Sequence, residues 1–344
     1  MVRKSSDSSQ TPITAERLEL LARIAGMYYE DRLTQEQIAA QTGYSRSMVS
    51  RLLTEARDQE VVEIRINHPL ERRRDLEEKL QSLLGLKVVQ VLARGTLSYA
   101  HMLRRLGSLA ARFIEGLIFD NATIGVSWGT AISETINAMR PRPRTGIHVV
   151  QMIGSLGPPD PDIDGPELAR RLARTLGGQY STFPVPLFVD SEATREMLRN
   201  DTRVQRVTAH FKDVDLALLG VGTVEPERSS LLRGNYLSEA QLAELQQAGA
   251  VGDVAVIHFD VQGRLTDIPL ARQVMGIDPQ TLRERPLRVG VAGGQLKSKP
   301  ILGASRAGLI NMLITDEVAA SNVIQLLRAE GVPENGADPQ GVSG

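Results

Sequence analysis

The segment from residue 33 to residue 53 has apolar positions at three- and four-residue spacing in two blocks, with a turn between them. Thr34 and Ser45 stand where each helix would begin and can cap it, and Gly43 accepts the left-handed backbone that a tight turn needs. The apolar residues of each block share one helix face. They are Ile38 and Ala39 in the first block and Met48, Val49, Leu52 and Leu53 in the second. The pattern predicts a helix-turn-helix.

A longer helix is predicted before this pair and an alternating segment after it. Thr14 can cap a helix that runs to about Glu30. Its apolar face is formed by Leu18, Leu21, Ile24 and Ala25. Residues 61–67, VVEIRIN, alternate between apolar and polar, which is typical of a short strand or wing. Residues 13–67 are therefore predicted to form a winged helix-turn-helix domain, and the polar, Ser-rich arm at 1–12 is expected to be disordered.

A charged amphipathic linker helix is predicted over residues 68–85, around and after Pro69. Its apolar residues fall on one side and are Leu76, Leu80, Leu83 and Leu84. Such a face needs a partner. It could pair two subunits or pack on the chain's own second domain, and the pattern does not separate these two possibilities.

From residue 86 onward, short β-rich runs alternate with helical patterns. The runs are KVVQVLA, NATIGVSWG, IHVVQMIGS, DLALLGVGT, VAVIHFD, LRVGVAGG and NMLITDE. This alternation predicts an α/β domain over residues 86–330, with a mostly parallel sheet covered by helices on both faces. Residues 331–344 are rich in Gly, Pro and acids and are expected to be a disordered tail.

The polar face of the helix-turn-helix offers side chains suited to DNA. Arg can bond guanine edges or phosphates, and Ser, Thr, Gln and Tyr can bond phosphate oxygens. The DNA-binding candidates are Thr34, Gln35, Tyr44, Ser45, Arg46, Ser47, Ser50 and Arg51. An ordinary helical hairpin is the alternative interpretation.

Composition narrows the class of protein. The 344 residues are 42% hydrophobic and 24% charged, which is ordinary for a soluble globular chain and long enough for two domains. The sequence has no apolar run long enough to span a membrane and no signal-like apolar core near Met1, so a cytoplasmic protein without a membrane partner is expected. The absence of cysteine excludes thiolate metal sites, and the five scattered histidines make zinc unexpected.

Net charge limits how DNA could be bound. The formal net charge is only −1, whereas phosphate contacts call for positive charge. The DNA-facing charge must then be a local patch that includes Arg46, Arg51 and Arg57. Binding as a dimer would double those contacts.

Ligands of an open parallel sheet bind beyond the carboxyl ends of its strands, so the loops after the apolar runs are the candidate effector site. Three of these loops carry glycines, hydroxyls or a cation that can approach an anion closely. Asp253 follows Gly252, where a carboxylate could accept bonds from the hydroxyls of a polyol. The effector-binding candidates are Trp128, Gly129, Thr130, Gly222, Thr223, Asp253, Gly293, Gly294 and Lys297. Tight strand-to-helix turns and an Asp-capped turn are the alternatives.

Binding is favoured over catalysis. His258 and His148 stand in apolar runs and are expected to be buried, hydrogen-bonded residues. Asp316, within Thr315-Asp316-Glu317, most simply caps the last helix. Because no nucleophile and base stand at a recognisable spacing, the sequence predicts no catalytic residue and no cofactor.

From about Leu18 to Leu327 the chain resembles the SorC family of bacterial transcriptional regulators, also called DeoR-like sugar-binding regulators. The motifs occur in the family's order and read LTQEQIAAQTGYSRSMVSRLL, VVEIRIN, IGVSWGTAI, VDLALLGVGT, GAVGDV, VGVAGGQLK and INMLITDE. The chain departs from the pattern at Ser298-Lys299-Pro300. Lys299 is therefore expected to add a second cation near the ligand, and Pro300 to change where the helix begins.

The resemblance implies a C-terminal domain similar to sugar-phosphate isomerases and deaminases, with a phosphorylated sugar or related metabolite as effector. It also implies a homo-oligomer, dimer or tetramer, that binds an operator in double-stranded DNA and regulates carbohydrate metabolism. Carried over by motif, Gly129, Thr130, Gly222 and Thr223 would flank the ligand, and Asp253 and Lys297 would hold its hydroxyl and phosphate groups.

Two further functions stay open. The shared fold would also suit an isomerase- or deaminase-like enzyme fused to a DNA-binding module, with Asp253 as a base. The second half could instead be an oligomerisation scaffold, in which case Asp253 and Lys297 would tolerate substitution.

Overall fold

The computed structural model describes residues 14–59, 61–62, 70–157 and 161–332. The chain divides into two compact units, residues 1–68 and 69–344. The predicted arm at 1–12 lies outside the described residues. The same holds for the predicted wing beyond residue 62 and for the predicted tail beyond residue 332.

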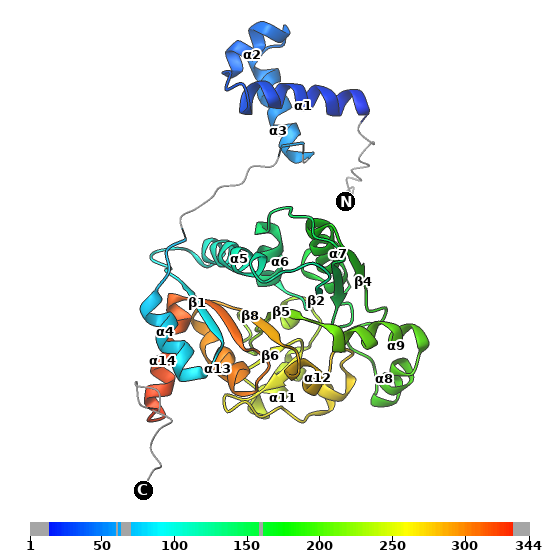
Figure 1. Ribbon diagram of the computed structural model, residues 1–344, viewed down its shortest axis with the longest axis vertical. Helices are drawn as coiled ribbons and strands as arrows, with labels where there is room; N and C mark the ends of the chain where they lie inside the picture. Colours follow the sequence, from blue (N-terminus) through cyan, green and yellow to red (C-terminus); the bar gives the residue numbers. More distant parts are fainter. Residues whose placement is uncertain (1–13, 60, 63–69, 158–160, 333–344) are drawn as a thin grey trace, which may run out of the picture. The chain divides into compact units, whose positions relative to one another are not determined.

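The first unit contains three helices, α1 (Ala15–Tyr29), α2 (Gln35–Thr42) and α3 (Arg46–Asp58) (Figure 1). Their caps are the predicted residues. Thr14, Thr34 and Ser45 each accept a hydrogen bond from a backbone N–H in the first turn, and Gly43 ends α2 at φ 75°. A separate apolar core holds the three helices together and consists of Leu21, Ile24, Ala25, Ile38, Val49, Leu52, Leu53 and Ala56.

Three of the predicted core positions differ in the structure, and one of them, Met48, is only partly buried. Leu18 is 41% exposed, so the prediction that it faces inward with Leu21 is wrong. Ala39 is only partly buried. An ion pair adds to the packing, because the Arg17 guanidinium donates Nε to Glu55 Oε1 over 2.9 Å and so joins α1 to α3. Hydrogen bonding from Arg17 lowers the pKa of the Glu55 carboxyl.

Separate cores predict separate unfolding. Leu52→Ala removes a fully buried side chain from the helical unit and is expected to destabilise that unit by about 2–5 kcal/mol. The matched variant Leu80→Ala removes an equally buried side chain from the second unit. In differential scanning calorimetry of the full-length chain, each variant should lower the midpoint temperature of a different unfolding transition. A single transition lowered by both variants would contradict independent folding.

The second unit is built on a seven-stranded sheet in the order β1-β9-β8-β5-β2-β3-β4, with parallel pairing throughout. The strands are β1 (Val88–Leu92), β2 (Thr123–Val126), β3 (His148–Gln151), β4 (Gln179–Ser181), β5 (Leu216–Gly220), β8 (Leu287–Val291) and β9 (Met312–Asp316). Six of these seven strands lie in the predicted runs. The exception, β4, has three residues and no apolar run.

Both faces of the sheet are covered by helices (Figure 1). In β5, Leu216 and Leu218 point into one apolar cluster, and Ala217 and Leu219 point into the other. The first cluster contains residues of α5 (Tyr99–Glu115), α6 (Thr130–Ala138) and α7 (Gly165–Leu176). The second contains residues of α4 (Arg74–Leu84), α11 (Glu239–Gln247), α12 (Pro279–Arg283), α13 (Ser298–Arg306) and α14 (Glu317–Ala329). Burial on both sides explains why the strands are continuous apolar runs.

Shorter elements complete the unit. They are η1 (Pro161–Ile163), α8 (Glu192–Arg199), α9 (Thr202–Ala209), η2 (His210–Asp213), α10 (Ser230–Arg233), η3 (Pro269–Gln273) and η4 (Gln295–Lys297). Within the described ranges, no helix is both long and apolar enough to cross a bilayer.

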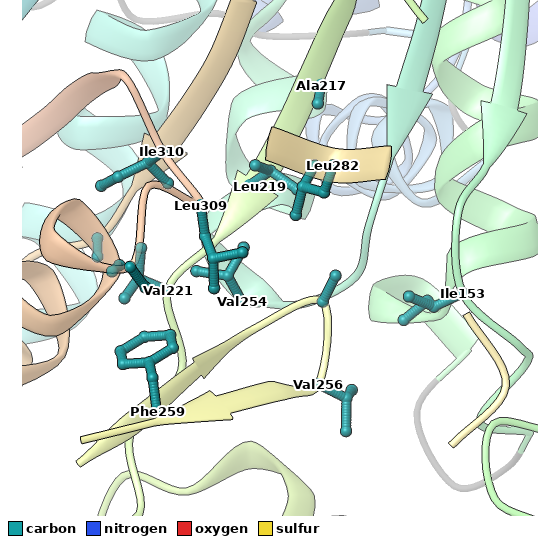
Figure 2. Packing of buried hydrophobic residues seen from close by; sticks show 14 of the residues in the cluster. Ile153, Ala217, Leu219, Val221, Val254, Val256, Phe259, Leu282, Leu309 and Ile310 are labelled. Carbon is teal, nitrogen blue, oxygen red and sulfur yellow. The ribbon is translucent and has the colours of Figure 1, made fainter. Parts of the chain in front are cut away.

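The run VAVIHFD is not a strand of the parallel sheet, so that prediction is wrong. It forms an antiparallel hairpin from β6 (Gly252–Val254) and β7 (Ile257–Phe259). Ala255 and Val256 make the two-residue turn with φ values of 51° and 62°, which matches the right-handed twist of a hairpin but is costly for a β-branched residue. Both turn residues are buried members of the second apolar cluster, and Val256 is labelled among the members of this cluster in Figure 2. Tertiary packing therefore sustains the turn.

The predicted linker helix is α4, which begins only at Arg74, so the prediction is wrong for the described residues 70–73. Helix α4 packs on its own domain. Leu80 is fully buried, and the buried Glu77 carboxylate accepts from the Val91 backbone N–H over 2.9 Å and from Arg72. The first of these bonds joins the helix to β1. Of the two partners that the sequence left open for its apolar face, the structure shows this one.

Candidate functional site

The start of α3 presents most of the predicted DNA-binding side chains to solvent. Thr34, Ser45, Arg46, Ser47, Ser50 and Arg51 are exposed, whereas Gln35 and Tyr44 are partly buried. Tyr44 packs against the core of the helical unit, so less of its side chain is free than the sequence suggested.

The two arginines of this surface differ in their surroundings. Arg46 Nε lies 3.3 Å from Glu36 Oε1 on α2, and both side chains are 69% exposed. Part of the Arg46 charge is thus offset locally. Arg51 has no carboxylate at ion-pair distance within the part of the chain that the structure describes, so its guanidinium is the less encumbered of the two.

In the second unit, the loops after β2, β5 and β8 meet at one cavity of about 280 Å³, which we name the first cavity. Among the predicted residues it is lined by Trp128, Gly129, Thr130, Gly222, Thr223, Asp253, Gly293 and Lys297. These strands are adjacent in the sheet, and their carboxyl ends lie at the same edge. Gly294 is the exception, since it does not line this cavity.

One wall of the first cavity is the N-terminus of α6. Gly129 precedes the helix at φ 113°, a conformation that L side chains rarely adopt, and gives it no side-chain cap. The first backbone N–H groups of α6 are then available to an anion, which the helix dipole also favours. Trp128 is buried beside them and contacts Tyr236 edge-on.

Lys297 supplies a cation to the first cavity. Its Nζ donates to the Val221 carbonyl oxygen over 2.8 Å. Burial lowers the pKa of this ammonium to about 8, and the nearby Asp253 carboxylate opposes that shift. Lys297 is therefore still mainly protonated at neutral pH.

Asp253 reaches the first cavity from the β6–β7 hairpin and is 5% exposed. Its Oδ2 accepts from the Val256 N–H over 3.1 Å, and its carbonyl oxygen accepts from the Gly222 N–H over 2.8 Å. A Cβ at Gly222 would lie 1.7 Å from Asp253 Oδ1, so glycine is required for this close approach. The carboxylate both caps the hairpin turn, as the alternative interpretation held, and faces the cavity.

Among the lining residues that were not predicted from the sequence, five have charged or aromatic side chains. They are Tyr99 and Arg104 of α5, Glu134 of α6, and Arg228 and Arg233 from the segment after β5. Burial raises the pKa of Glu134, while Arg104 and Arg171 oppose the rise. No local motif marks these side chains. Tyr99, Arg104 and Glu134 reach the cavity because α5 packs closely on α6, where a Cβ at Gly107 would lie 2.6 Å from the Glu134 backbone. The segment after β5 brings Arg228 and Arg233 to it.

The remaining predicted positions lie elsewhere. The Gly294 N–H donates to Asp316 Oδ1 over 2.7 Å, and Asp316 also accepts from Ala319, so it caps α14 as predicted. Helix α13 begins at Ser298, and Lys299 is exposed and absent from the cavity lining. The expectation that Lys299 adds a second cation beside this ligand site is therefore wrong.

Both singled-out histidines lie outside the first cavity. His258 is buried on β7, and this burial lowers its pKa. His148 is partly buried at the start of β3 and shares a 2.8 Å hydrogen bond with Ser181. Among the described residues, no three His, Asp or Glu side chains come together as a metal ion would require.

Comparison with known proteins identifies a sugar-binding domain family and two transcriptional regulators that are similar to this chain. Residues 68–325 match the family model described as "Putative sugar-binding domain". The chain is 30% identical over 309 residues to the deoxyribonucleoside regulator of Bacillus subtilis (strain 168), covering 90% of this chain and 98% of that protein. It is 32% identical over 311 residues to the transcriptional regulator LsrR of Enterobacter sp. (strain 638), covering 90% and 93% respectively.

A solved structure is similar over both units. The full-length sorbitol operon regulator SorC from Klebsiella pneumoniae matches with a TM-score of 0.68 at 27% identity, covering 90% of this chain and all of that one. The similarity therefore includes the helical unit as well as the α/β unit.

Proposed function

Because the chain belongs to the SorC family of transcriptional regulators, we propose that it binds operator DNA through α2 and α3, under the control of a phosphorylated sugar held in the first cavity. The observation that carries the effector assignment is the charge of that cavity. Four cationic side chains, Arg104, Arg228, Arg233 and Lys297, face only two carboxylates, Glu134 and Asp253.

The cavity supports a ligand with two kinds of group. Free N–H groups of α6 and the Lys297 ammonium favour a phosphate. Asp253, almost fully buried, can accept hydrogen bonds from sugar hydroxyls. A phosphorylated sugar or a related polyol phosphate has both groups in one molecule.

The DNA assignment rests on α3. Its buried face is fully used in the core of the helical unit, and its exposed face begins with Ser45, Arg46 and Ser47. Residues at the start of a recognition helix are those that normally reach base edges. Arg51 lies about one turn further along the same face, within reach of a base or a phosphate.

We further propose a cytoplasmic homo-oligomer that binds and does not turn over its ligand. Two copies of α3 would be needed to give the positive charge that a chain of net charge −1 lacks. The ligand changes operator affinity only if it binds one subunit arrangement more tightly than another. Asp253, the candidate base, already accepts a backbone hydrogen bond, and His258 lies outside the cavity lining.

A thermal-shift panel tests the effector class. Pentose and hexose phosphates are expected to raise the melting temperature of the second unit, whereas the matching unphosphorylated sugars are not. A ligand at a hundred times its Kd stabilises the folded state by about 2.7 kcal/mol. Equal shifts with and without phosphate would contradict the proposed class, and no shift with any compound at millimolar concentration would contradict an effector site.

A further inference from the structure

A second cavity adjoins the first, and no part of the proposed function uses it. It has a volume of about 600 Å³ and lies beyond the carboxyl ends of β1, β8 and β9. Its lining includes Arg94, Thr96, Glu227 and Gln295. Four residues line both cavities, and they are Tyr99, Arg228, Gly293 and Lys297.

Arg228 stands at the boundary between the two cavities. The centre of its guanidinium lies 4.0 Å from the centroid of the Tyr99 ring. Among the described residues, no carboxylate lies within ion-pair distance of this partly buried side chain. A guanidinium stacked on a ring keeps its N–H groups free at the edges of its plane, where they can bind a carboxylate or phosphate.

Arg94 supplies a second cation to the second cavity. Its guanidinium lies 3.3 Å from Asp316 Oδ2. Asp316 is fully buried and also accepts from the Gly294 and Ala319 N–H groups, and Glu317 is paired with Arg73. These two nearby carboxylates are thus already satisfied. Glu227 is the exposed carboxylate of the lining and has no hydrogen-bonded partner in the described structure.

We propose that the second cavity is a separate binding site for a small oxyanion, a phosphate or a carboxylate, held by Arg94 and Arg228 with donors from Thr96 and Gln295. Arg228 and Lys297 also line the first cavity. Anions in the two cavities compete for these cations and repel each other, so each weakens the binding of the other. An anion in the second cavity therefore lowers the affinity of the first cavity for the effector. The binding site stands without the proposed function, whereas its coupling to an effector rests on it.

Equilibrium dialysis of the full-length protein with radiolabelled inorganic phosphate tests the number of sites. The wild type is expected to bind two phosphates per chain at low ionic strength. Thr96→Asp, a change at an exposed position, places a carboxylate in the second cavity. This variant should bind only one phosphate per chain. Arg94→Gln should also abolish binding of the second phosphate. Because Arg94→Gln breaks the ion pair to Asp316 as well, Thr96→Asp is the test that leaves this ion pair in place.

Two matched neutralisations assign each phosphate to its cavity. Glu227 lines only the second cavity and Glu134 only the first. Glu227→Gln should raise the affinity for phosphate in the second cavity by about three- to tenfold. Glu134→Gln should raise the affinity for phosphate in the first cavity by a similar factor. In the wild type, a sugar phosphate that fills the first cavity should weaken the remaining phosphate by about fivefold or more.

The outcomes separate the two proposals. If at most one phosphate binds per chain, and neither Thr96→Asp nor Glu227→Gln changes it, the second site is overturned. If a phosphate responds to Glu227→Gln but none responds to Glu134→Gln or is displaced by any sugar phosphate, the second site stands and the proposed effector site fails.

Discussion

Arg51→Ala is expected to weaken binding of the full-length protein to its operator by about thirtyfold or more. An arginine that bonds a guanine edge contributes about 1–3 kcal/mol to discrimination. Both subunits of a dimer lose the contact, which gives about 2–6 kcal/mol in total by the same principle. Fluorescence anisotropy with a labelled operator fragment measures the change. Folding should be unaffected, because Arg51 is exposed and points away from the core.

Arg23→Ala is the matched control for Arg51→Ala. Arg23 is an exposed arginine of the same helical unit, on α1. Its replacement removes the same charge and should change operator affinity little. Arg46→Ala is expected to have an intermediate effect, since Glu36 already offsets part of that charge. Equal losses for Arg23 and Arg51 would show that only net charge matters and would contradict a specific recognition helix.

Lys297→Ala is expected to weaken effector binding by about a hundredfold or more while leaving ligand-free operator binding unchanged. The variant removes the partly buried cation beside Asp253, and a charge-assisted hydrogen bond to phosphate in such a setting contributes about 1.5–3 kcal/mol. Loss of long-range attraction in the cavity adds to this. Titration of the effector against the protein–operator complex measures the response. Lys299→Ala, an exposed lysine two residues further on, should behave as wild type.

The pH dependence of effector binding gives a second measure of Lys297. The protonated ammonium binds an anion, and the pKa of Lys297 is about 8. Affinity should therefore be constant near pH 7 and then fall by about tenfold for each pH unit once the proton is lost above that pKa. Lys297→Arg keeps its charge to much higher pH and should show no such fall. A wild-type affinity that stays flat to pH 9.5 would contradict the role of Lys297.

The β6–β7 hairpin could not be predicted from the hydrophobic pattern of the sequence. VAVIHFD has the composition of a buried strand, and no Gly or Asn marks the turn. Ala255 and Val256 adopt positive φ because their burial in the second apolar cluster offsets the local cost. This turn also brings Asp253 to the first cavity. The motif thus identified Asp253 as a lining residue, but Asp253 lies on an antiparallel hairpin and not beside a strand of the parallel sheet, as the pattern had predicted.

Local pattern was sufficient for the caps Thr14, Thr34 and Ser45, for Gly43, and for six strands of the sheet, because each depends on neighbours within a few residues or on the alternation of burial. The same reasoning identified the glycine-rich loops and Lys297. Strand order then brought those loops to one edge of the sheet. Arg104, Glu134, Arg228 and Arg233 could not be found in this way, because long-range packing of α5 on α6 and of the segment after β5 places them. The charge of the cavity, and the stacked arginine that separates it from its neighbour, follow from contacts between residues far apart in the chain, which no short-range periodicity encodes.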